Sequence, residues 1–121
     1  MNAAPDDQSQ RLRQLLAEAD SREQQARNRL AEVRSLQQGQ SADDEHDPDG
    51  VPVSFEWSKA QAMLEQAVAE RERLQRAVDA AARGAYGVCA VCGREIDARR
   101  LAARPDATLC IECARAQELQ R

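Results

Sequence analysis

Apolar residues recur along the first third of the chain at alternating spacings of four and three positions. One member of the series, Glu23, is charged; the series is Leu12, Leu16, Ala19, Glu23, Ala26, Leu30 and Val33. This is the heptad pattern of a helix that packs in a coiled coil. The segment from Asp7 to Gln10 has the form of a capping box, so we expect the helix to begin there and Gly39 to end it.

The same spacing returns in the second half of the chain, again with one charged member, Arg71. The series is Ala60, Leu64, Ala67, Arg71, Leu74, Val78 and Ala81. We expect this helix to begin near Ser54 or Ser58 and to end at Gly84. Two heptad helices joined by a short loop should fold back as an antiparallel hairpin about 40 Å long, at about 1.5 Å per residue. Glu23 and Arg71 then fall at similar heights, where they either pair or stay solvated.

The periodicity disappears between the two helices. Residues 41–50 contain five carboxylates and no lysine or arginine. Pro48 and Pro52 oppose a continuous helix, and Asp49-Gly50 favours a turn. The only histidine, His46, lies in this segment and is interpreted as a solvated loop residue. Residues 40–53 are therefore predicted to form an acidic loop at the tip of the hairpin.

Composition narrows the function further. Aromatic residues make up only 2% of the chain, and the formal net charge is −4. Few side chains can anchor a large globular core, and the overall charge does not favour nucleic-acid binding. No stretch approaches the ~18 apolar residues of a membrane span, and the N-terminus lacks the apolar core of a signal peptide, so a cytoplasmic location is expected.

Four cysteines carry the clearest chemical signal, with the spacing Cys89-x2-Cys92-x17-Cys110-x2-Cys113. Two Cys-x-x-Cys turns supply the four soft ligands that zinc prefers, and four cysteines leave no open position for catalysis. We therefore expect one structural zinc ion and no enzymatic activity. Glycine after the second cysteine lets the backbone turn beneath the metal. Four arginines near the site can offset the thiolate charge: Arg94, Arg99, Arg100 and Arg104.

Two other interpretations of the cysteines are weaker. A pair of disulfides is disfavoured by the expected reducing compartment, and a thioredoxin-like redox pair needs a βαβ context that this sequence lacks. The predicted fold is thus mainly α. It consists of a polar leader (1–7), a long antiparallel coiled-coil hairpin (8–83) and a small four-cysteine zinc-finger module (84–121) with a short C-terminal helix over 114–119.

The cysteine region also resembles a known family. The matching segments are Gly84 to Gly93, Ile96, Arg100-Leu101, Ala103 to Pro105 and Leu109 to Cys113. They resemble the C4-type zinc finger of the DksA/TraR family of bacterial transcription regulators, while the hairpin agrees with that family in architecture only. The resemblance implies a cytoplasmic protein that binds RNA polymerase, without sequence-specific contact to DNA, and inserts its coiled coil into the secondary channel.

The resemblance also suggests effector and ligand residues. Better-known members carry Asp-x-x-Asp-x-Ala at the tip; here Asp44 and Asp47 have that spacing, and Asp49 stands where alanine is expected. A second alignment places Asp49 at the critical carboxylate. Some members also bind guanosine tetraphosphate. Arg73 and Arg104 match basic residues of that site, whereas Ala114 falls where a lysine is expected.

Two other classes of function remain open from the sequence. The first is a zinc-containing coiled-coil interaction module with no transcriptional role. The second, weaker one is direct nucleic-acid binding by the zinc module, whose four arginines are balanced by four carboxylates even before the thiolates are counted. These carboxylates are Glu95, Asp97, Asp106 and Glu112.

Overall fold

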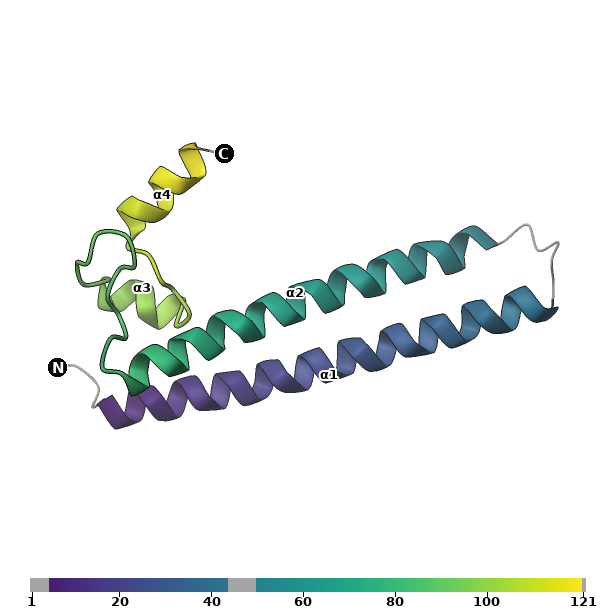
Figure 1. Cartoon of the computed structure of the whole chain (residues 1–121), viewed down its shortest axis with the longest axis horizontal. Coiled ribbons are helices and arrows are strands. Elements are labelled where there is room, and N and C mark those ends of the chain that lie inside the picture. Colours follow the sequence, from purple (N-terminus) through teal and green to yellow (C-terminus); the bar gives the residue numbers. More distant parts are fainter. Residues whose placement is uncertain (1–4, 44–49, 121) are drawn as a thin grey trace. The chain divides into compact units, whose positions relative to one another are not determined.

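The computed structural model describes residues 5–43 and 50–120, and these residues contain four helices (Figure 1). They are α1 (Pro5–Asp43), α2 (Gly50–Ala82), α3 (Ala98–Ala103) and α4 (Ile111–Leu119). Within these residues no β-strand forms, and a single antiparallel bridge joins Val88 to Glu95. The mainly α fold predicted from the sequence is confirmed. No described helix is both long and apolar enough to cross a membrane.

The chain divides into two compact units. One unit is Glu18–Arg71, which contains the greater part of α1 and α2. The other combines Met1–Ala17 with Glu72–Arg121, so it joins the two remaining helix segments to the cysteine module.

Within Glu18–Arg71, α1 and α2 lie side by side and run in opposite directions (Figure 1). Ion pairs join the two helices: Arg22 donates to Glu70 at 2.7 Å, and Arg29 donates to Glu56 at 3.4 Å. The side chain of Arg34 also lies 5.2 Å from the centre of the Trp57 ring. These contacts confirm the antiparallel hairpin.

The hairpin buries the predicted heptad positions, and in α2 it also buries Ala77, which lies outside the predicted series. In both helices, every seam position is buried or half-buried. Between Leu12 and Val33, every residue outside the seam except Leu15 is exposed. Leu36, which the pattern places off the seam, is 61% exposed. Burial of this one stripe, rather than helix propensity alone, is what stabilises such helices.

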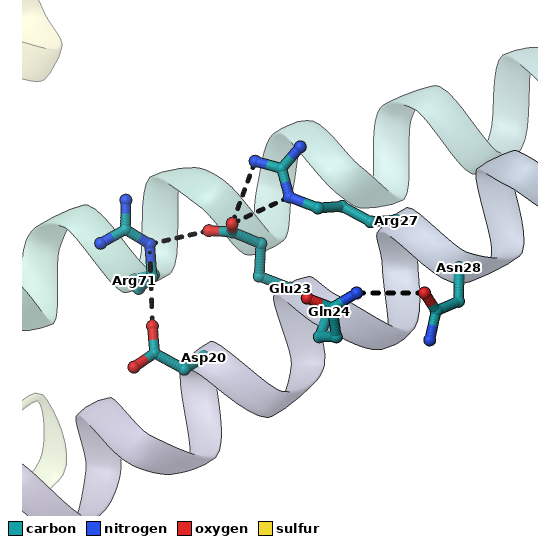
Figure 2. A network of polar contacts seen from close by, with 6 residues as sticks. All are labelled: Asp20, Glu23, Gln24, Arg27, Asn28 and Arg71. Atoms are coloured by element: carbon teal, nitrogen blue, oxygen red, sulfur yellow. Dashed lines mark hydrogen bonds and ion pairs between the residues drawn. The ribbon is translucent and has the colours of Figure 1, made fainter.

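The charged seam residues pair with each other (Figure 2). Arg71 donates from Nε to Oε1 of Glu23 at 2.7 Å, and Arg27 donates to Oε2 of the same carboxylate at 3.1 Å. The Nε of Arg71 also lies 3.8 Å from Asp20. The pairing interpretation of the sequence is therefore correct, and the solvated one is not.

The predicted loop is too long at both ends. Gly39 does not end α1, which continues to Asp43, and α2 begins at Gly50 rather than near Ser54 or Ser58. An interior glycine costs a helix only about 1 kcal/mol, so a long helix tolerates it. Pro52 lies in the first turn of α2, where its missing N–H would have no helical partner in any case.

The first helix also begins earlier than predicted. α1 starts at Pro5, so the segment from Asp7 to Gln10 lies inside the helix and does not cap it. Proline is favoured at the first helical position because its fixed φ already suits the helix. The tip residues Asp44, Asp47 and Asp49, together with His46 and Pro48, lie outside the described residues.

The predicted end of the second helix is confirmed. Gly84 has a φ of +73°, its N–H bonds the carbonyl of Ala81 at 3.1 Å, and the N–H of Ala85 bonds that of Ala80 at 2.8 Å. This pair of bonds is the Schellman motif, which uses a left-handed residue to satisfy the last carbonyls of a helix. Glycine adopts that conformation without a Cβ clash.

Candidate metal centre

The four cysteines meet at one point in the structure. Their four Sγ atoms all lie within 4.8 Å of one another, and those of Cys92 and Cys110 are 3.8 Å apart. A tetrahedral site with zinc–sulfur bonds of about 2.3 Å places its sulfurs about 3.8 Å from one another. All four cysteines are free thiols, so the disulfide interpretation is wrong. The donor set and its spacing fit one structural zinc ion.

The first cysteine turn is closed by local backbone bonds. The N–H of Cys89 bonds the carbonyl of Arg94 at 2.8 Å, and the N–H of Gly93 bonds that of Cys89 at 3.0 Å. Gly93 has a φ of +76°, which residues with a Cβ rarely adopt. This is the tight turn that the sequence predicted for a glycine after the second cysteine.

The second cysteine turn opens α4. Cys110 is the N-cap residue, and its carbonyl accepts the first helical bond from Ala114 at 2.9 Å. The short C-terminal helix of the prediction is confirmed, although it starts at Ile111 rather than Ala114. A further bond, from the N–H of Ala90 to the carbonyl of Thr108 at 2.8 Å, holds the two turns together. The thiolates of the second turn thus lie at a helix N-terminus, whose partial positive charge stabilises anions.

The thiols differ strongly in acidity. Hydrogen bonds from the backbone amides of Cys92 and Cys110 lower the pKa of Cys89 to about 6. Hydrogen bonding to Cys110, followed by burial, raises the pKa of Cys113 to about 12. Closely spaced thiols cannot all ionise unless a cation neutralises them. A divalent metal ion supplies that charge, and the cluster is therefore suited to binding one.

Of the four arginines expected to offset the thiolates, one contacts a sulfur. Arg94 places Nε 3.5 Å from the Sγ of Cys92, and this contact lowers the pKa of that thiol. Arg99 pairs with Asp97, and Arg100 donates to the carbonyl of Leu109 at 2.9 Å. The side chain of Arg104 makes no ion pair with the described residues.

The basic residues suggested by the family resemblance lie together. Arg73 and Arg104 line one cavity of about 330 Å³, together with Asp106 and Ala114. Arg73 donates from Nε to Asp106 at 2.9 Å, so a carboxylate of the chain already occupies part of this basic site. The sequence did not predict that pairing, because the two residues are 33 positions apart.

The structure adds an element that the sequence analysis missed. α3 spans six residues and begins after Asp97, whose side chain accepts a bond from the N–H of Arg99 at 2.8 Å. An aspartate before a helix start is a signal that could have been recognised. A hydrogen bond and a buried side chain stabilise the segments that flank α3. The hydroxyl of Tyr86 donates to the carbonyl of Pro105 at 2.8 Å, and Ile96 is buried.

Comparison with known proteins agrees with this geometry. Residues 84–119 match the prokaryotic dksA/traR C4-type zinc finger. The cysteine module is therefore a zinc finger of the DksA/TraR C4 type. As expected for that zinc-finger type, the chain has one structural zinc ion as its cofactor.

Two relatives extend the comparison. Over 35 residues this chain is 51% identical to the RNA polymerase-binding transcription factor DksA of Haemophilus influenzae. That match covers 29% of this chain and spans about a quarter of the relative's length, 24%. The structure of transcription factor DksA2 from Pseudomonas aeruginosa is similar with a TM-score of 0.63 and 27% identity. The similarity covers 93% of this chain and 84% of that one.

Proposed function

We propose that this protein binds RNA polymerase and regulates transcription, without enzymatic activity of its own. The observation that carries the proposal is similarity at two levels. The zinc finger resembles that of an RNA polymerase-binding factor, and the fold resembles a second transcription factor over most of both chains. The first likeness alone covers too little of the chain to support a function for the whole.

In this proposal Cys89, Cys92, Cys110 and Cys113 ligate the zinc ion. The metal has no catalytic role, because four thiolates complete its coordination shell. It stabilises a small module that buries few large side chains; in the cysteine module the buried residues are Cys89 and Ile96. A zinc-stabilised module can therefore serve as a rigid docking element.

The coiled-coil hairpin enters the secondary channel of polymerase with its acidic tip first. In the sequence, Asp44, Asp47 and Asp49 stand between the last residue of α1 and the first residue of α2. Carboxylates brought near a bound metal ion or a basic pocket perturb the local field. The tip is then the effector, and the flanks and zinc module supply affinity.

Guanosine tetraphosphate is a candidate ligand of the same protein. Its phosphates would meet Arg73 and Arg104 in the shared cavity, since guanidinium groups bind phosphate in a bidentate manner. Asp106 competes for Arg73, and Ala114 supplies no charge. We therefore expect any response to this nucleotide to depend on polymerase for additional contacts.

The test is a pair of assays with purified bacterial core RNA polymerase. Wild-type protein should be retained by immobilised polymerase at near-physiological salt and should change initiation in a purified transcription assay. The triple variant Asp44→Asn, Asp47→Asn, Asp49→Asn should bind nearly as well but no longer regulate. Its stability should change by less than about 0.5 kcal/mol, as for surface substitutions generally.

A second triple variant distinguishes the effect of losing the tip carboxylates from the effect of losing net charge. Glu18, Glu65 and Glu72 are exposed on the helices and make no ion pair with the described residues. Changing all three to Gln removes the same charge but keeps the tip carboxylates, so regulation should remain at protein concentrations that saturate polymerase. If wild-type protein fails to bind polymerase, the protein is a coiled-coil interaction module of another kind. If it binds and the tip variant regulates normally, docking holds but the tip is not the effector.

A further inference from the structure

Arg94 contacts both cysteine turns of the zinc module. It follows Gly93 in the first turn, where its Nε lies 3.5 Å from the Sγ of Cys92. Its Nη2 donates to Oε2 of Glu112 at 3.0 Å. Glu112 lies between Cys110 and Cys113, so one guanidinium spans from the first turn to the second.

The two contacts concern the most accessible part of the metal centre. Cys89 is almost fully buried, whereas Cys92 is exposed. Of the four sulfurs that would hold the zinc ion, that of Cys92 is therefore the most open to a chelator or water. The group beside this sulfur is well placed to control how readily the zinc ion is lost.

The chemistry of the centre makes a neighbouring cation valuable. Zinc with four thiolates carries a net charge of about −2. A guanidinium beside a thiolate stabilises this charge and orients the sulfur, and partners of this kind tune metal affinity by about 10–100-fold. The Arg94–Glu112 pair is exposed and by itself contributes little to folding. Its effect is expected on the metal rather than on the fold.

We propose that Arg94 and Glu112 form a clamp that retains the zinc ion. Arg94 is a positioning residue: it neutralises the thiolate of Cys92 and, through Glu112, keeps the two cysteine turns from separating. By holding the Cys92 sulfur and the second cysteine turn in place, the clamp would keep the four sulfurs gathered for the zinc ion and slow its loss to a chelator. The proposal does not depend on whether the protein binds polymerase.

The chain offers a matched control. Arg99 is also an arginine of the zinc module and lines the same cavity of about 500 Å³ as Arg94. It pairs with Asp97, two residues away, and its side chain is 93% exposed. Replacing Arg99 removes the same charge from the same region without touching a sulfur or the second cysteine turn.

The experiment measures zinc release from full-length, zinc-loaded protein. Excess chelator is added, and release is followed with a zinc-sensitive dye. Arg94→Met should release zinc about tenfold faster, at the lower end of the range for such partners. Arg94→Lys keeps the charge but loses the guanidinium that contacts two groups at once, and Glu112→Gln loses the ion pair between the two cysteine turns. Each should increase the rate of zinc release less than Arg94→Met does. Arg99→Met should match the wild type.

Two further measurements keep the result interpretable. Circular dichroism of each zinc-loaded variant should superimpose on the wild type, because only metal retention is affected. Adding Glu112→Gln to Arg94→Met should accelerate release no further, since the clamp is already open. Equal release from Arg94→Met and wild type, or equal acceleration by Arg99→Met, would overturn the proposal.

Discussion

Glu23 occupies a seam position of the coiled coil with only 15% of its side chain exposed. Its carboxylate accepts hydrogen bonds from Arg71 and then Arg27, and these bonds, Arg71 first, lower the pKa of Glu23. A partly buried charge is destabilising unless a partner meets it. Because Arg71 comes from the facing helix at this height, its pair with Glu23 also favours one register of the hairpin over its neighbours.

The pH dependence of stability tests this residue. The pKa of Glu23 is lowered from 4.5 on folding, so its contribution is present above about pH 4.5 and is lost as pH falls through the lower folded value. Glu23→Gln should lower the melting temperature at pH 7. The difference in melting temperature between this variant and the wild type should be smaller at pH 2. The exposed Glu18→Gln serves as control. A difference that does not change with pH would argue against the ion pair.

At the scale of elements, the two long helices depend on one narrow apolar stripe. Its members include many alanines, and large side chains such as Leu30 and Leu64 are half-buried. Alanine brings helices close but buries little area, so the few leucines contribute a large share of the packing. The exposed Leu36 lies beside the stripe without joining it.

Leucine-to-alanine substitutions test the register of these elements. Leu30→Ala and Leu64→Ala should each cost about 2 kcal/mol, the lower end for large-to-small changes, because both side chains are half-buried. Leu36→Ala should change stability by less than about 0.5 kcal/mol. Thermal melts followed by circular dichroism give the ranking. If Leu36→Ala were the most destabilising of the three, the heptad register would be wrong.

At the scale of the whole molecule, the two compact units depend on different interactions. Glu18–Arg71 relies on packing and ion pairs between two helices. The other unit contains the four cysteines and little apolar core around them. Metal binding supplies much of the folding free energy of such a module. None of the four clustered cysteines lies in Glu18–Arg71.

Loss of zinc should therefore unfold one part of the chain selectively. Cys92→Ser should lose the metal and the exchange protection of amides in residues 84–119. Amides of Glu18–Arg71 should stay protected. Val91→Ser changes an exposed residue in the same cysteine turn and should keep one zinc per chain. Hydrogen exchange measures the amide protection, and metal analysis measures the zinc content. Equal loss of protection in residues 84–119 and in Glu18–Arg71 would contradict the idea that the two units unfold separately.

The sequence by itself determined the seam residues, the four cysteines and the end of α2 at Gly84. Each of these is a local or periodic signal. A 3.5-residue repeat places side chains on one face whatever the partner is. Two Cys-x-x-Cys turns favour a metal site, and a glycine after a helix supplies a left-handed residue. For this reason these predictions needed no knowledge of contacts distant in the chain.

Only the tertiary structure decided which charges meet. Four arginines near the cysteines looked equivalent in sequence, yet Arg94 alone among them contacts a described sulfur, while Arg73 pairs with Asp106 across 33 positions. The tertiary structure also extended α1 past Gly39 and started α2 before Pro52. Long charged side chains can reach many partners, so only the folded chain decides which of them pair. A single helix-breaking residue costs less free energy than the packing of a long helix contributes, so packing decides where the helices end.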